Sequence, residues 1–374
     1  MTSGVSPGRV RLVLEDGSEF SGTGFGASSF CVAGEVVFNT GMTGYVEALT
    51  DPSYRGQILV LTYPLVGNYG VPAPRRPGSL EGPYESARIQ PQALVVQSCS
   101  LHYSHHEARR SLDDWLAAEG VPGLSGVDTR TLTRILREHG TMRGWLFPDT
   151  MDFAEARVSA ATVEMSAQVF REVAPTEVVT YEGGRTRILL VDCGAKDQIV
   201  RSILARGATV VRTPWYENLA ALAKDADGIL IGNGPGDPQN LGSLAEQLRG
   251  LMDSFRGPVF GVCLGHQVLS MAVGARTYKL TYGHRGVNQP VQDLLSRRCY
   301  VTSQNHGYAV ADQTLPSDWE SWFVNINDGT NEGVRSRSRP HFSVQFHPEA
   351  SPGPQDTGAL FDEFLSLATS LSRR

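Results

Sequence analysis

Apolar residues in the second half of the chain are grouped into short runs that alternate with amphipathic stretches. The run RILLVDCG at 187–194 predicts a buried strand, and along 196–207 the apolar residues recur at helical spacing up to a closing glycine. Three further apolar runs repeat this order, at 209–215, 228–234 and 258–263, with helical stretches between them. Such a β-α-β series predicts an α/β fold with a mostly parallel sheet covered by helices on both faces.

Beyond Gly274 the pattern changes to strands and one closing helix. The strands are predicted at 275–280, 299–304 and 341–347, and the helix at 359–371.

The first 150 residues follow a different pattern. Residues 10–22 and 33–40 alternate between apolar and polar positions and break at glycines, which is typical of half-buried strands. One helix is predicted within 126–140, because Asp128 can cap its start and Gly140 can end it. This half is therefore expected to be a β-rich α+β domain.

The length of 374 residues fits two domains better than one. Periodicity weakens over 151–185, which ends near a Gly-Gly pair. We therefore predict a first domain at 1–150, a linker at 151–185 and a second domain at 186–374.

Composition narrows the classes of partner. A net charge of −6 argues against a nucleic acid or an anionic membrane recognised by bulk charge, so small-molecule or protein partners are expected. The first residues lack a signal-peptide pattern, and no stretch reaches the roughly 18 apolar residues of a membrane span, which predicts a cytoplasmic protein.

Five well-separated cysteines favour neither a disulfide framework nor a zinc site. The histidines at 102, 105 and 106 favour a solvated loop, so no metal site is predicted.

Cys263 is the main candidate for chemistry. In GVCLGHQ (261–267) it stands between an apolar strand and a predicted helix, with Gly261 and Gly265 where side chains would crowd a sharp turn. This pattern is typical of a nucleophile elbow, and the start of a helix favours the thiolate form. The alternative is a buried structural thiol. Cys193 also follows a strand, but it lacks the flanking glycines and is interpreted as a buried apolar residue.

A base for this nucleophile is available in QFHPE (345–349). Pro348 favours an extended residue before it, and in an extended chain the side chains of His347 and Glu349 point the same way. The carboxylate would then hold the imidazole, although a lone His-Pro is usually only a turn. The glycine-rich loop at 231–238 offers backbone amides for an oxyanion hole, with a phosphate cradle or a plain tight turn as alternatives.

These motifs carry a resemblance to a known family. GVCLGHQ, NGPGDP (233–238) and QFHPE resemble the class I glutamine amidotransferases, whose flavodoxin-like domain uses a Cys-His-Glu triad to release ammonia from glutamine. The segments at 34–70, 126–141, 302–310 and 349–354 are similar to the glutaminase (small) subunit of carbamoyl-phosphate synthetase. The stretches at 39–45, 61–70 and 327–333 look closer to the glutaminase part of eukaryotic multifunctional pyrimidine enzymes than to the bacterial subunit. A separate subunit is nevertheless expected.

The resemblance implies a role for each matching residue. Cys263 would form a γ-glutamyl thioester, His347 would protonate ammonia and then activate water, and Glu349 would orient His347. The backbone amides of Gly234 and Leu264 would hold the oxyanion. The glutamine would be bound by Ser53, Gly236, Gln267, Asn305, Gly307 and Tyr308. Because Ser53 belongs to the first half, the glutamine site is expected where the domains meet.

The resemblance also implies a partner. Ammonia would pass to a large ATP-grasp subunit that makes carbamoyl phosphate from bicarbonate, ammonia and ATP, in a heterodimer that could assemble further. No cofactor is expected in this chain, with ATP and Mg²⁺ on the large subunit. One alternative is another class I amidotransferase or a cysteine hydrolase, but such an enzyme would not need the first domain. Another is a non-catalytic regulatory module, but the intact triad argues against it.

Overall fold

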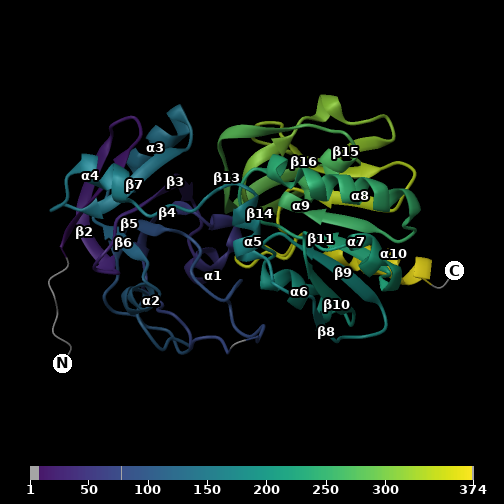
Figure 1. The fold of residues 1–374 in the computed structure, drawn as a ribbon, viewed down its shortest axis with the longest axis horizontal. Helices are drawn as coiled ribbons and strands as arrows, with labels where there is room; N and C mark the ends of the chain where they lie inside the picture. The colour runs from purple at the N-terminus through teal and green to yellow at the C-terminus, as the bar shows by residue number, and fades with distance from the viewer. Residues whose placement is uncertain (1–7, 77, 373–374) are drawn as a thin grey trace. The chain divides into compact units, whose positions relative to one another are not determined.

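The computed structural model describes residues 8–76 and 78–372 and divides the chain into two compact units (Figure 1). The first unit runs from Met1 to Glu164 and the second from Met165 to Arg374. The segment predicted as a linker is shared between them, because it contains α4 (Phe153–Ser159) in the first unit and α5 (Ala167–Val173) and β8 (Val179–Tyr181) in the second.

The first unit is built on a closed barrel with the strand order β1-β2-β6-β5-β4-β3-β7. Its strands are β1 (Arg9–Leu14), β2 (Glu19–Gly26), β3 (Val32–Asn39), β4 (Gln57–Val66), β5 (Ala93–Cys99), β6 (Pro122–Ser125) and β7 (Met142–Pro148). Its helices are α1 (Tyr45–Thr50), the 3-10 helix η1 (Pro52–Tyr54), α2 (Leu112–Ala118), α3 (Thr129–His139) and α4. The prediction of a β-rich α+β domain is confirmed.

Helix α3 matches its sequence signals. The side chain of Asp128 accepts a hydrogen bond from the Thr131 amide at 3.0 Å, and Gly140 ends the helix with φ of 93°. Leu132 and Leu136 are buried on its inner face. On α2, Leu112 and Trp115 enter the same apolar core as Leu59 and Leu94 of the barrel strands.

The second unit has a ten-stranded sheet in the order β14-β13-β15-β16-β17-β12-β11-β9-β10-β8. Its strands are β8, β9 (Arg187–Asp192), β10 (Thr209–Pro214), β11 (Gly228–Ile231), β12 (Val259–Val262), β13 (Thr277–Asp293), β14 (Cys299–Val310), β15 (Trp319–Asn325), β16 (Asn331–Ser336) and β17 (His341–Val344). Its helices are α5, α6 (Asp197–Leu204), α7 (Leu219–Leu222), α8 (Gly242–Ser254), α9 (Leu264–Ala272) and α10 (Ala359–Ser372), with 3-10 turns η2 (Ala223–Asp225), η3 (Pro238–Leu241) and η4 (Asp312–Thr314).

The parallel part of this sheet confirms the predicted α/β fold. Strands β10, β9, β11, β12 and β17 pair in parallel, and α6, α9 and α10 pack against them. The sequence prediction missed β15 and β16 and predicted only parts of β13 and β14. Register shifts between Lys279 and His284 and between Gly286 and Gln289 interrupt the period-two pattern of β13.

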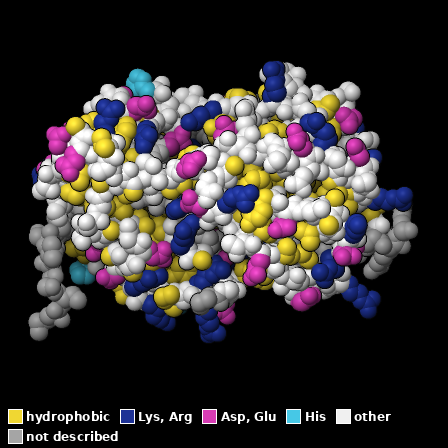
Figure 2. Space-filling model, in the orientation of Figure 1, with side chains coloured by type: hydrophobic (Ala, Val, Ile, Leu, Met, Phe, Trp, Pro, Cys, Tyr) yellow, Lys and Arg dark blue, Asp and Glu magenta, His cyan; other side chains and the backbone are white. Residues whose placement is uncertain are grey.

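Basic and acidic side chains are interspersed on the face of the molecule shown in Figure 2. Along residues 8–76 and 78–372, no helix combines the length and apolar character that crossing a membrane would require.

Candidate active site

Cys263 forms a strained elbow between β12 and α9. Its φ of 55° and ψ of −105° lie in a region that side-chain-bearing residues rarely occupy. Two glycines make the turn possible. A Cβ atom at Gly261 would lie 2.5 Å from the Gly265 carbonyl oxygen, and one at Gly265 would lie 2.1 Å from the Ile231 carbonyl oxygen. The predicted elbow geometry is therefore confirmed.

The sheet order explains why distant residues gather around this elbow. Strands β9, β11, β12 and β17 are parallel neighbours, so their carboxyl ends lie at one edge of the sheet. Lys196 follows β9, the loop with Gly234 follows β11, Cys263 follows β12 and His347 follows β17. Side chains separated by up to about 150 residues of chain can therefore meet at this edge.

The predicted contact between His347 and Glu349 is confirmed, but its geometry is not that of an extended strand. The Nδ1 atom of His347 lies 2.6 Å from Oε1 of Glu349, and both residues are buried. His347 pairs with Ser303 in an isolated β-bridge, and the chain turns through Pro348, with the Ala350 amide donating to the His347 carbonyl at 3.1 Å. The turn, not strand alternation, therefore brings the imidazole to the carboxylate.

Lys196 adds a positive charge to this pair. Its ammonium lies 3.1 Å from Oε1 of Glu349 and also donates to the Ala350 carbonyl. Burial alone would raise the pKa of Glu349, but the charges of Lys196 and His347 outweigh it and lower the pKa to about 2. Glu349 is therefore a carboxylate at every physiological pH.

Neighbouring charges also act on His347. Burial opposes its protonation, but Glu349 and the nearby Cys263 raise the pKa of His347 to about 10. Its Nδ1–H is directed to Glu349, which leaves Nε2 as the nitrogen for proton exchange. In the described structure Nε2 has no hydrogen-bond partner of good geometry, while the Cys263 sulfur lies 3.7 Å from the Asn305 carbonyl oxygen. Contacts of this kind commonly tighten only when substrate binds.

Two backbone amides near the sulfur are available for an oxyanion. Leu264 is the first residue of α9, directly after Cys263. Gly234 lies close to it, since a Cβ atom added at Gly234 would be 2.8 Å from the Leu264 side chain. Among the described residues, neither amide donates a backbone hydrogen bond. Both amides therefore stay candidates for the oxyanion hole. Gly236 lies in the same loop, between β11 and η3.

Several predicted glutamine-binding residues lie next to the nucleophile. The Nε2 atom of Gln267 donates to the Tyr308 carbonyl at 2.9 Å and to Oε1 of Gln345 at 3.0 Å. The predicted residues on β14 are Asn305, Gly307 and Tyr308. Their segment contacts both Cys263 and Gln267, so the structure brings these positions together within the second unit.

Ser53 is the one predicted site residue that belongs to the first unit. It is buried in η1, where its amide donates to Oδ1 of Asp51 at 2.9 Å. Its part in glutamine binding stays a prediction.

Sequence reasoning missed two polar residues of this site, Lys196 and Gln345. Lys196 stands in the sequence GAK, three residues after Cys193. Its place just beyond a predicted buried strand was therefore visible in the sequence. Cys193 itself is fully buried, and burial raises the pKa of its thiol well above the usual value, as does Asp192. It is therefore a poor nucleophile. His102, His105 and His106 lie exposed in a loop of the first unit.

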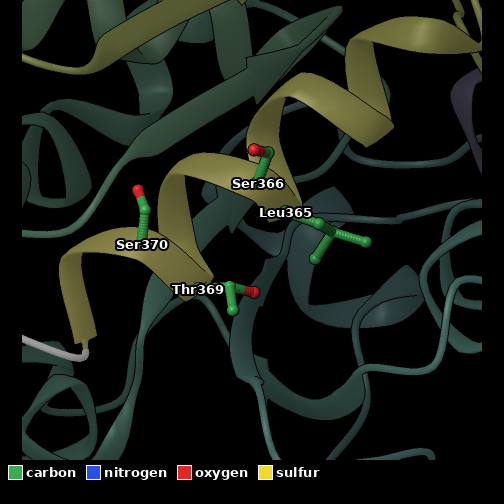
Figure 3. Close-up of a pocket in the computed structure, with 4 residues that line it drawn as sticks. All are labelled: Leu365, Ser366, Thr369 and Ser370. Carbon is green, nitrogen blue, oxygen red and sulfur yellow. The ribbon is translucent and has the colours of Figure 1, made fainter.

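A surface pocket in the second unit is unrelated to these residues. It lies along α10 and is lined by Leu365, Ser366, Thr369 and Ser370, which include none of the candidate catalytic side chains (Figure 3).

Two family descriptions match successive parts of the chain. Residues 12–146 match the carbamoyl-phosphate synthase small chain, CPSase domain, and residues 189–367 match glutamine amidotransferase class-I. The carbamoyl phosphate synthase arginine-specific small chain of Aspergillus oryzae is 46% identical over 96% of this chain and 80% of its own length. The corresponding protein of Neurospora crassa is 44% identical over 97% of this chain and 81% of its own length.

A longer protein contains the same region. The multifunctional protein pyrABCN of Emericella nidulans is 45% identical over 96% of this chain, which spans only 17% of that protein. The first family match lies within the barrel unit, and the second lies within the unit that contains the Cys263 elbow. The chain therefore belongs to the carbamoyl-phosphate synthase small-chain family.

Proposed function

We propose that this chain hydrolyses glutamine to glutamate and ammonia at Cys263, through a γ-glutamyl thioester. Membership of the small-chain family makes it the glutamine-hydrolysing subunit of a carbamoyl-phosphate synthase. The observation that carries the proposed chemistry is the strained Cys263 elbow beside the buried His347–Glu349 pair.

The first half-reaction releases ammonia. The Cys263 thiolate attacks the side-chain amide carbon of glutamine, and the developing oxyanion accepts hydrogen bonds from the amides of Gly234 and Leu264. The carbon–nitrogen bond breaks while imidazolium His347 gives its Nε2 proton to the leaving nitrogen. Glu349 keeps the opposite ring nitrogen protonated and stabilises the imidazolium charge.

The second half-reaction restores the enzyme. Neutral His347 takes a proton from water, and the resulting hydroxide attacks the thioester carbon. The carbon–sulfur bond breaks, glutamate leaves and the Cys263 thiolate returns. The net reaction consumes one glutamine and one water and gives one glutamate and one ammonia.

The ammonia is then used by a second protein. We assign that step to a large ATP-dependent subunit that binds ATP and Mg²⁺ and forms carbamoyl phosphate. The names of the Aspergillus oryzae and Neurospora crassa relatives support this assignment, since each is called a small chain of carbamoyl phosphate synthase, which implies a larger partner chain. In the second unit, the glutamine site would include Gly236, Gln267, Asn305, Gly307 and Tyr308, and in the first unit Ser53.

The test compares Cys263→Ser with the matched control Cys193→Ser. Both replace a buried thiol that follows a parallel strand, but only the first removes the proposed nucleophile. Glutamate release should be lost in Cys263→Ser and retained in Cys193→Ser. Synthesis of carbamoyl phosphate from added ammonia, in the complex with the large subunit, should survive in both. Undiminished glutamate release by Cys263→Ser would refute the proposal.

A further inference from the structure

Three buried side chains outside the triad converge in the antiparallel part of the second sheet. They are His284 on β13, His306 on β14 and Glu332 on β16, and their nearest nitrogen and oxygen atoms all lie within 4.8 Å of one another. His284 and His306 are direct partners in the β13–β14 register, so the backbone fixes their proximity. This group is termed the His-His-Glu cluster below.

The outer nitrogen of each imidazole contacts an oxygen that can only accept a hydrogen bond. Nε2 of His284 lies 2.8 Å from Oδ2 of Asp328, whose other oxygen accepts from the Thr330 amide at 3.1 Å. Nδ1 of His306 lies 2.9 Å from the Tyr308 carbonyl oxygen. Each outer nitrogen therefore carries a proton, and in a neutral ring the inner nitrogen then presents a lone pair.

The inner nitrogens face Glu332. Nδ1 of His284 and Nε2 of His306 lie 3.2 Å and 3.8 Å from its Oε1 atom. The Nδ2 group of Asn325 donates to the same oxygen at 3.2 Å and lies 3.4 Å from Nδ1 of His284, which suits a lone pair there. The other carboxylate oxygen, Oε2, is buried and has no hydrogen-bond partner among the described residues.

The inner nitrogen of His306 faces a second acceptor. Oε1 of Gln304 lies 3.2 Å away, and the orientation of that amide is set because its Nε2 group donates to Oγ1 of Thr302 at 3.1 Å. Thr302 in turn donates to the Gln289 carbonyl at 2.8 Å, so its oxygen is free to accept. A lone pair on His306 that faces only oxygen acceptors requires either a second proton or a cation between them.

We propose that His284, His306 and Glu332 bind a divalent transition-metal ion of the zinc class. Two imidazole nitrogens and one carboxylate oxygen are a ligand set that zinc accepts, and at bond lengths of about 2.0–2.2 Å the ligand atoms would draw closer together than the 4.8 Å within which they now lie. Asp328 and the Tyr308 carbonyl already hold the outer nitrogens as second-layer groups do in zinc proteins. The ion would take the place of the second proton that the contacts of His306 otherwise need, and it would face the lone pair on Nδ1 of His284.

The location suggests what the ion would do, and this step rests on the proposed function. His306 lies between Asn305 and Gly307 on the segment assigned to glutamine binding. An ion joining β13, β14 and β16 would hold that segment in place. Loss of the ion should therefore raise the KM for glutamine more than it lowers kcat.

The binding test uses the full chain with Cys263→Ala, so that the catalytic thiol cannot bind zinc. After dialysis against a chelator, titration with Zn²⁺ should show one tight equivalent by calorimetry and by elemental analysis. Co²⁺ should give the visible absorption of a low-coordinate nitrogen–oxygen site. Asp328→Asn should weaken zinc binding by about 10–100-fold, and Glu332→Gln should weaken it further. The matched control His105→Ala with His106→Ala removes two exposed histidines and should leave the tight equivalent unchanged.

The test stays decisive even if a variant fails to fold, because the parent Cys263→Ala chain must itself bind zinc. Absence of a tight equivalent in that chain would overturn it, as would equal binding by folded Glu332→Gln. Detection of protons on both nitrogens of His306 by ¹⁵N NMR, with Zn²⁺ present, would also overturn it. These measurements do not depend on glutamine hydrolysis, so they stay decisive if the proposed function fails.

Discussion

At the elbow, His347 is assigned the transfer of protons and Glu349 the orientation of His347. Nδ1 of His347 contacts Glu349 and Nε2 is left for proton transfer, whereas the Glu349 carboxylate contacts the imidazole and the Lys196 ammonium. Removing the base and removing its support should therefore have different kinetic consequences.

His347→Asn should lower kcat for glutamate release by about 10²–10⁴-fold, since no group is left to move the proton. Glu349→Gln should lower it less, because an imidazole remains and the amide can still contact it. The matched control is His105→Asn, which changes an exposed histidine and should leave kcat unchanged. Equal losses in the two triad variants, with intact circular dichroism, would mean that Glu349 does more than orient.

The low pKa of Glu349 also predicts how stability depends on pH. Its folded pKa of about 2 lies below the ordinary value of 4.5, so its stabilising contribution is present above pH 4.5 and is lost as pH falls toward 2. Urea unfolding of the wild type and of Glu349→Gln should differ most above pH 4.5, and the difference should shrink on acidification. A difference that is constant from pH 7 to pH 3 would contradict this charge assignment.

At the scale of elements, the position of the nucleophile depends on how closely α9 approaches the sheet. Gly265 allows the first turn of α9 to lie against the end of β11, and Gly261 allows β12 to pass beneath it. The elbow is therefore held by backbone contact that any side chain would disturb.

Gly265→Ala should lower the free energy of unfolding by about 1–3 kcal/mol, the usual range for forcing extra atoms into a close-packed site. Glutamate release should fall as well, because Cys263 must move with the helix. Gly250→Ala is the matched control. Gly250 lies exposed in α8 with open space around it, so the change should be neutral or stabilising by up to about 1 kcal/mol. Denaturant unfolding and glutamate assays check both, and an unaffected Gly265→Ala would show that α9 can shift without harm.

At the scale of the whole molecule, the chain combines a barrel unit with the unit that contains the triad. The triad belongs to the second unit, and a small misalignment between groups that bind glutamine and groups that react with it can lower a rate greatly. An unregulated glutaminase would also release ammonia without use.

The isolated chain is therefore expected to hydrolyse glutamine slowly, with a large increase in kcat when the large subunit, ATP and bicarbonate are added. Glutamate release at saturating glutamine, with and without the partner, measures the effect. The complex with Cys263→Ser provides the background rate. An isolated chain that already works at the rate of the complex would contradict this coupling.

The sequence by itself determined the features that depend on neighbouring residues. The elbow at Cys263, the cap at Asp128 and the β-α-β order are local patterns, since strand, turn and helix signals lie within a few residues of one another. The triad could be named because its motifs resemble those of a family. The physical contact of His347 with Glu349 was also predictable, although a turn and not an extended strand produces it.

Only the tertiary structure decided which distant residues share a site. Lys196 meets Glu349 because β9 and β17 end at the same edge of the sheet, and Gln345, which follows β17, meets Gln267 of α9 because β17 and β12 are neighbours. His284, His306 and Glu332 converge because β13, β14 and β16 belong to the antiparallel extension, whose bulged and polar strands gave no clear periodicity. Strand order is set by packing over the whole unit, so these contacts were outside the reach of local sequence patterns.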